Sequence, residues 1–177
     1  MIYPDGPTRM GVPAPADSGR CVVSVHAEHT VTVRQSVAEV FAFLADGLNN
    51  PRWRPEVSAV RLLSDAGTEG RAGARYAQTL TGPGGVTIPG DYLLSVCEPP
   101  HRLEFEVIAG PGRPTGSFTL REAAADAAGG ADRSGTEVVF ALDLALTGAL
   151  VAMAALVRKL AQQEVKNLDN LQAALDA

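Results

Sequence analysis

TGALVAMAALVRKLAQQEVKNLDNLQAALDA, residues 147–177, is the stretch that decides the fold. Its apolar side chains recur at steps of three and four, which is the period of a helix with one apolar face. Thr147 is placed to act as the N-cap, and no proline or glycine interrupts the segment after Gly148. At about 1.5 Å per residue the helix would be roughly 40 Å long, so it needs a broad apolar surface to lie on. The apolar positions are Leu150, Met153, Val157, Leu160, Leu168, Leu171 and Leu175, with Glu164 in the one polar slot.

The residues before this helix read as a strand. Between Thr136 and Leu146 apolar side chains alternate with more polar ones, which is the period of a strand with one buried face. Residues 138–157 carry one charge, Asp143, and are long enough to span a bilayer. The alternation, and the break at Thr147-Gly148, favour a strand followed by a helix over a membrane span.

Length and composition indicate one globular domain. The chain has 177 residues, 46% of them hydrophobic and 20% charged. The net charge of -5 predicts no attraction to nucleic acid or to an acidic membrane surface. Cys21 and Cys97 are too few for a disulfide framework or a metal site, so we expect a reduced, cytoplasmic protein without a cofactor. Residues 1–20 contain four prolines and no apolar core, and are interpreted as a disordered tail before a domain spanning 21–177.

The remaining segments predict strands, turns and two short helices. Ser36 and Glu39 have the spacing of a capping box, and Asp46-Gly47 is interpreted as the end of the first helix, with glycine in the left-handed C′ position. A second short helix or turn covers residues 49–55. The low-complexity residues 123–135 are expected to form a mobile hairpin tip. Strands are predicted at 21–34, 57–63, 75–80, 86–96 (interrupted at Pro89-Gly90), 102–108, 115–121 and 136–146.

This order predicts an α+β fold in which a curved, seven-stranded antiparallel sheet wraps around the terminal helix. It resembles the helix-grip fold of the START-like superfamily, and within it the SRPBCC branch of polyketide cyclases/dehydrases and lipid transport proteins. The resemblance covers about residues 23–175. The stretches that carry it are Ser36–Phe41, Asp46–Pro55 with Trp53, Gly73–Tyr76, Glu98–Leu103 and Gly135–Val138.

Members of this superfamily enclose a cavity between the sheet and the long helix. The resemblance therefore implies a pocket, not a reaction. By strand alternation we assign aromatic and amide side chains to the inner face, and the middle of the helix lies opposite them. The Gly- and Pro-rich loops 81–90 and 109–115 are expected to border its mouth. The candidate ligand-binding residues are Trp53, Tyr76, Gln78, Tyr92, Phe105, Phe118, Phe140, Val157 and Glu164.

Each of these residues also has a purely structural interpretation. The aromatic side chains could simply pack under the helix as core. Glu164 could sit at the edge of the apolar stripe in water; inside the cavity its pKa would be raised unless it were paired. His29 has inward parity, His26 outward parity, and His101 falls in a turn, so we expect structural histidines more often than catalytic ones.

Three functions stay open at this point. The first is a binding or carrier protein for a small hydrophobic molecule, lipid- or polyketide-like, without catalysis. The second is a polyketide cyclase/dehydrase-type enzyme, in which a tyrosine or histidine would move protons. The third is a co-chaperone-like interaction domain, which would need an exposed apolar patch or a charged groove; the sequence shows neither. No nucleic-acid partner is expected, and a homodimer stays open.

Overall fold

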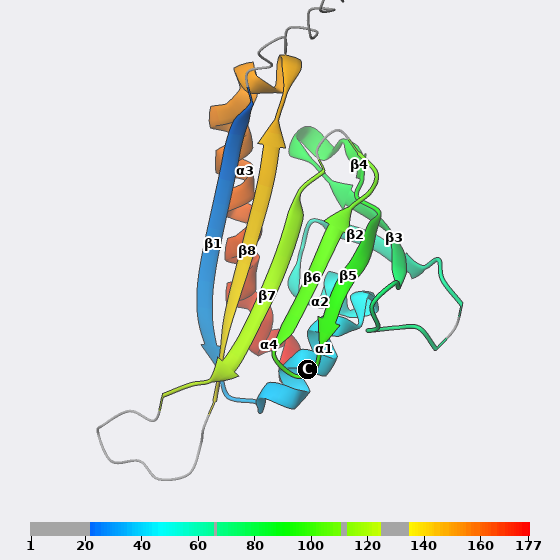
Figure 1. Ribbon diagram of the computed structural model, residues 1–177, viewed down its shortest axis with the longest axis vertical. Coiled ribbons are helices and arrows are strands. Elements are labelled where there is room, and N and C mark those ends of the chain that lie inside the picture. The colour runs from blue at the N-terminus through cyan, green and yellow to red at the C-terminus, as the bar shows by residue number, and fades with distance from the viewer. Residues whose placement is uncertain (1–21, 66, 111–112, 125–134) are drawn as a thin grey trace, which may run out of the picture.

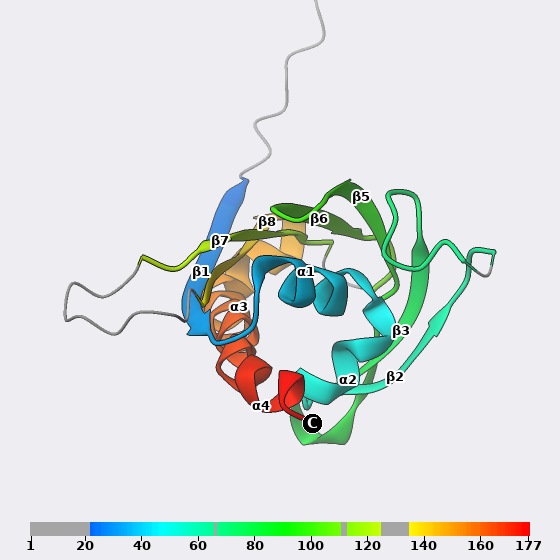
Figure 2. The same cartoon turned by 90° about the horizontal axis from the view of Figure 1, so that it is seen from below.

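The computed structural model describes residues 22–65, 67–110, 113–124 and 135–177. The tail expected at residues 1–20 and most of the hairpin tip expected at 123–135 lie outside these ranges. An antiparallel sheet curls around a C-terminal helical run, and two short helices close one end (Figures 1 and 2). The α+β helix-grip fold is therefore confirmed.

The sheet has eight strands in the order β1-β8-β7-β6-β5-β3-β2, with β4 paired to β3. Every strand pair is antiparallel. The strands are β1 (Val23–Val33), β2 (Val57–Leu62), β3 (Arg75–Thr81), β4 (Thr87–Pro89), β5 (Tyr92–Glu98), β6 (Arg102–Val107), β7 (Thr115–Glu122) and β8 (Thr136–Leu146). The eighth strand arises because the segment predicted at 86–96 divides at Pro89-Gly90 into β4 and β5.

Helix α1 (Val37–Ala45) follows β1, and its capping box is confirmed: the Ser36 side chain accepts from the Glu39 amide while the Glu39 carboxylate accepts from Ser36. Asp46 is the C-cap of α1, so the helix ends where predicted and Gly47 occupies C′. The expected left-handed conformation is wrong, because Gly47 opens the 3-10 helix η1 (Gly47–Asn49) without a positive φ. Glycine is needed there because an added Cβ would lie 2.0 Å from the Tyr92 hydroxyl. Helix α2 (Asn50–Trp53) follows directly.

The C-terminal run is helical from Gly148 to Leu175, but it is not one regular α-helix. It comprises η3 (Gly148–Met153), α3 (Ala154–Lys166), η4 (Asn167–Asn170) and α4 (Leu171–Leu175). Thr147 occupies the N-cap position, but its side chain makes no capping hydrogen bond within the described residues. No described helix combines the length and apolar character needed to cross a bilayer.

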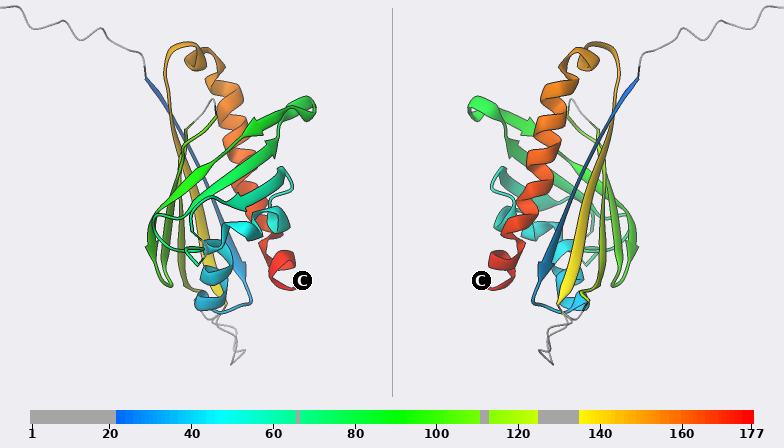
Figure 3. Two further views of the ribbon diagram at one scale, coloured as in Figure 1. Left: turned by 90° about the vertical axis from the view of Figure 1, so that its right-hand side faces the viewer. Right: turned by 90° about the vertical axis from the view of Figure 1, so that its left-hand side faces the viewer.

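The apolar stripe of this run is buried only in its C-terminal part. Leu168 and Leu171 are fully buried, whereas Met153 and Leu160 are 47% and 44% exposed. α3 packs on β1 and β8, while its N-terminal half projects toward the end of the molecule opposite the C-terminus (Figure 3). The core therefore concentrates where α1, α2 and the end of the helical run meet the sheet.

The loop around α2 holds the C-terminal part of the run through polar contacts. Arg52 Nη2 donates to the Ala174 carbonyl at 2.8 Å, and Asn170 Nδ2 donates to the Trp53 carbonyl at 3.1 Å. Asn167 Nδ2 donates to Glu56 Oε2 at 2.7 Å. These contacts fix the angle at which the run leaves the sheet.

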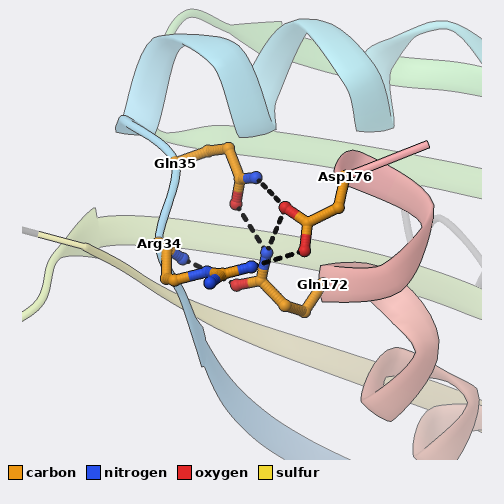
Figure 4. A network of polar contacts seen from close by, with 4 residues as sticks. All are labelled: Arg34, Gln35, Gln172 and Asp176. Atoms are coloured by element: carbon orange, nitrogen blue, oxygen red, sulfur yellow. Dashed lines mark hydrogen bonds and ion pairs between the residues drawn. The ribbon is translucent and has the colours of Figure 1, made fainter.

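A second polar network joins the end of β1 to α4 (Figure 4). The Arg34 amide donates to Gln172 Oε1 at 2.8 Å, and the Arg34 guanidinium reaches Asp176 Oδ2 at 2.5 Å. Gln35 Nε2 donates to Asp176 Oδ1 at 2.8 Å. The hydrogen bond from Gln35, helped by those from Arg34 and Gln172, holds the pKa of Asp176 below its ordinary value. A carboxyl with a lowered pKa stabilises the fold above its ordinary pKa, and this contribution is lost as the pH falls through its folded value.

We therefore expect Asp176→Ala to lower the thermal midpoint at pH 7, because it removes the acceptor shared by three side chains. The difference from wild type should shrink on acidification below about pH 4, where the carboxyl protonates in both states. Circular dichroism melts at several pH values measure both effects. Asp65→Ala is the control, because Asp65 accepts hydrogen bonds through its backbone carbonyl. An equal loss in both variants would contradict the network's role.

Candidate functional site

A cavity of about 200 Å³ lies between the concave face of the sheet, α1, α2 and α3. Its surface is mostly apolar, with polar side chains from α2, β3, β5 and α3. The residues that line it are Leu44, Asn50, Trp53, Arg54, Gln78, Leu80, Ile88, Pro89, Gly90, Tyr92, Leu94, Leu103, Phe105, Val107, Pro114, Phe118, Leu142 and Glu164.

The exposure of these residues shows where the cavity opens. Those toward α1 and the centre of the sheet, such as Leu44, Leu103 and Phe118, are buried. Those on the β3–β4 hairpin and the β6–β7 connection, such as Ile88 and Pro114, are half-buried, and Pro89 is exposed. The mouth therefore lies at the end of the sheet where this hairpin and this connection meet. Both loops expected to border the mouth contribute to the cavity lining.

The aromatic side chains form one connected wall. Trp53 meets Phe118 edge to face at 6.0 Å between ring centroids, and Phe118 in turn packs against Phe105 at 6.1 Å. Phe105 meets Tyr92 edge to face at 5.8 Å. Such pairs contribute about 0.5–1.5 kcal/mol each beyond their area burial, so the contacts among the rings help to hold the wall in place.

Of the predicted site residues, the structure brings six to the cavity: Trp53, Gln78, Tyr92, Phe105, Phe118 and Glu164. Tyr76 and Phe140 lie one layer behind. Tyr76 stacks on Tyr92 at 5.1 Å and Phe140 stacks on Phe118 at 4.4 Å, so both support the wall without reaching the space. Val157 is half-buried, lies about two turns before Glu164 in α3, and does not contribute to the lining. Strand parity gives the face of a residue, but not which of two stacked layers it occupies.

Three neutral polar groups meet on one side of the cavity. Asn50 Nδ2 donates to Gln78 Oε1 at 2.8 Å and to the Tyr92 hydroxyl at 3.1 Å. All three residues are buried, and burial raises the pKa of Tyr92 well above its ordinary value. The phenol therefore stays protonated, and the group acts as a fixed set of donors and acceptors. Sequence analysis missed Asn50, although it lies inside the Asp46–Pro55 segment that carries the family resemblance.

A charged pair lies beside this neutral group. Arg54 Nη2 is 2.5 Å from Glu164 Oε1, and their side chains are 12% and 21% exposed. This approach is an electrostatic contact rather than an aligned hydrogen bond, because neither Arg54 Nε nor Glu164 Oε1 has a hydrogen-bond partner among the described residues. Arg54 is not among the predicted site residues; it follows α2 as its C-cap and lines the cavity. Glu164 therefore lies at the cavity, and its carboxylate is paired with Arg54.

The protein's three histidines lie elsewhere. His26 pairs with Asp143 at 2.8 Å on the outer face of the sheet, and His29 contacts Asp169 Oδ1 at 2.7 Å beside η4. His101 Nδ1 lies 3.1 Å from the Leu120 carbonyl in the β5–β6 turn. Each imidazole has a structural partner outside the cavity lining.

Comparison with known families gives one match over most of the chain. A family model described as polyketide cyclase / dehydrase and lipid transport matches residues 24–175. Comparison with curated proteins gave no match.

Solved structures share the fold at low sequence identity. A START superfamily protein from Mycobacterium smegmatis superposes with a TM-score of 0.63 at 17% identity, covering 85% of this chain and 97% of that one. TTHA0849 from Thermus thermophilus gives a TM-score of 0.67 at 20% identity, covering 86% and 97%. The di-domain ARO/CYC StfQ from the steffimycin biosynthetic pathway gives 0.68 at 13% identity, and this chain spans 86% of itself but only 51% of that protein. At these identities the similarity shows the fold alone.

The fit between Gly47 and Tyr92 yields a testable prediction. Gly47→Ala should destabilise the fold by about 1–3 kcal/mol, because the new methyl group would collide with the Tyr92 hydroxyl. Tyr92→Phe removes that oxygen, so the double variant should lose less than the sum of the two single losses. Urea unfolding of the four proteins measures this coupling. Strict additivity would contradict the close approach.

Proposed function

Because the chain belongs to the polyketide cyclase/dehydrase and lipid transport family, we propose that its cavity binds a small, mostly apolar molecule carrying one polar group. The observation that carries this proposal is the division of the cavity surface. A rigid aromatic and aliphatic wall faces the space on most sides, and the polar side chains gather near α2. Ligand sites with this mixture use apolar contacts for affinity and a few polar groups for orientation.

The polar side can receive a hydroxyl, carbonyl or similar group. Asn50, Gln78 and Tyr92 supply neutral donors and acceptors that are already ordered by their mutual hydrogen bonds. The buried indole Nε1 of Trp53 has no hydrogen-bond partner among the described residues, nor has Arg54 Nε. An unsatisfied buried donor costs roughly 1–3 kcal/mol, so a ligand acceptor that satisfied either one would gain affinity.

A cyclase/dehydrase-type enzyme is the alternative from the same family. Tyr92 is the phenol at the cavity, and its raised pKa makes proton release at neutral pH unfavourable. The histidines that could act as general bases are held elsewhere by Asp143, Asp169 and a backbone carbonyl. These observations favour binding over proton transfer.

Trp53 is the chain's one tryptophan and lines the cavity, so its indole N–H resonance is a single local reporter. We expect titration with naphthol, an apolar ring system with one hydroxyl, to shift this resonance in a saturable way. Val107→Phe should weaken the titration on the order of tenfold, because the larger side chain occupies part of the space.

Val139→Phe is the matched control. Val139 lies between the inward-facing Val138 and Phe140 on β8 and so faces the outside of the sheet, and it is half-buried like Val107. We expect this variant to bind naphthol like wild type. No shift in wild type, or an equal loss in both variants, would argue against a ligand cavity.

A further inference from the structure

The exposed apolar side chains are unevenly distributed. Eight large hydrophobic residues are exposed in the described part of the chain, and five of them lie on the segments that border the cavity mouth or on the helical run beside it. These five form what we call the rim: Val86, Ile108, Met153, Leu156 and Leu160.

Separate segments bring the rim residues to one end of the molecule. The hairpin that carries Val86 and the N-terminal half of the helical run project toward the same end, opposite the C-terminus (Figures 1 and 3). Ile108 follows β6, whose last residue Val107 lines the cavity. The rim therefore lies around the opening through which a ligand would pass.

Charge is segregated at the same place. Residues 79–90, 107–114 and 144–163 contain no Asp or Glu, but they include Arg113, Arg158 and Lys159, and all three are exposed. Of the carboxylates that flank these segments, Asp91 accepts from the Gln78 backbone N–H at 3.1 Å, Asp143 pairs with His26 and Glu164 pairs with Arg54. Glu106 is exposed at the end of β6, so among the described residues three cations face one unpaired carboxylate at this end. The net charge of -5 predicts no attraction to an acidic membrane, but the mouth is locally positive.

We propose that this rim docks the cavity mouth on a lipid bilayer that contains anionic headgroups. Apolar side chains that protrude among cations, without intervening carboxylates, combine the two forces that hold a peripheral protein at such a surface. Docking there would pass an apolar ligand between bilayer and cavity without crossing water. The last point rests on the proposed function, whereas the docking itself does not.

The same observations disfavour two other occupants. A second copy bound rim to rim across a two-fold axis would place cations against cations, with no carboxylate in these segments to offset them. An acidic protein would satisfy the charges, but it does not explain why the apolar residues ring the opening of an apolar cavity. Both alternatives are outcomes of the experiment below.

The test is co-sedimentation of the full chain with vesicles of phosphatidylcholine and phosphatidylglycerol in a three-to-one ratio, at physiological salt. Binding should be at least tenfold stronger than to pure phosphatidylcholine, because each basic residue near an anionic surface contributes on the order of a fivefold gain. Met153→Ser/Leu156→Ser/Leu160→Ser should reduce binding at least tenfold, and so should Arg158→Glu/Lys159→Glu.

Matched variants control for general effects of exposure and charge. Leu48→Ser/Leu63→Ser removes side chains that are 43% and 44% exposed elsewhere on the surface. Arg61→Glu/Arg75→Glu reverses two exposed arginines on β2 and β3. Both controls should bind vesicles like wild type. Absence of vesicle binding by the wild type, or equal losses in controls and rim variants, would overturn the proposal. A concentration-dependent dimer abolished by the rim substitutions, without vesicle binding, would show that a second copy covers the rim.

Naphthol binding at Trp53 separates this proposal from the proposed function. The rim variants leave the cavity lining intact and should keep wild-type naphthol affinity. Vesicle binding without naphthol binding would reject the ligand cavity and keep the docking surface. Naphthol binding without vesicle binding would reject the docking surface and keep the ligand cavity.

Discussion

The rest of the structure depends on one constraint, the attachment of the C-terminal helical run to α2 and to Glu56, which follows it. The sheet has two edge strands, β1 and β2, which are not paired with each other although the sheet is curved. α3 packs on β1 and β8, while α2 contacts β2 and α4. The hydrogen bonds of Arg52, Trp53 and Glu56 with the run therefore bridge the open side of the sheet. Packing of apolar surface supplies most of the stability, and these bonds select one orientation of the helix.

That orientation determines where the interior is filled and where it is hollow. Val165, Leu168 and Leu171 sink into the core beside α1, where the helix and the sheet are close. Toward the N-terminus of the run the side chains at Val157 and Leu160 are only partly covered. The aromatic side chains on the facing strands pack against one another through ring-to-ring contacts. The cavity therefore lies in front of this wall, on the N-terminal side of the part of the run that is buried in the core.

The fold could be predicted from the sequence because its signals are local and mutually consistent. The period of residues 147–177, the alternation in 136–146 and the Ser36–Glu39 capping box each indicate one structure, and all three agree with one topology. The site was less predictable because its residues depend on depth and on turns. Parity assigned Tyr76 and Phe140 to the inner face, but a second layer of rings stands in front of them. Arg54 was not predicted, because the direction of a side chain after a four-residue helix does not follow strand alternation. The net charge of the whole chain also does not show that segments far apart in the sequence bring cations together at one end of the molecule.

The segment Asn50–Glu56 combines two roles that are separate in most of the chain. Its backbone and the side chains of Arg52 and Glu56 hold the helical run, while Asn50, Trp53 and Arg54 face the cavity. Arg54 belongs to both groups, since its guanidinium binds Glu164 of α3 at the cavity surface. A ligand that approaches this side therefore meets groups whose positions are already set by the contacts that hold the helix. Such preorganisation lowers the entropy that binding must overcome, and it needs no dedicated binding loop. It also explains why a short stretch with two prolines is compatible with a rigid site: Pro51 and Pro55 restrict the backbone on either side of the residues that face the ligand space.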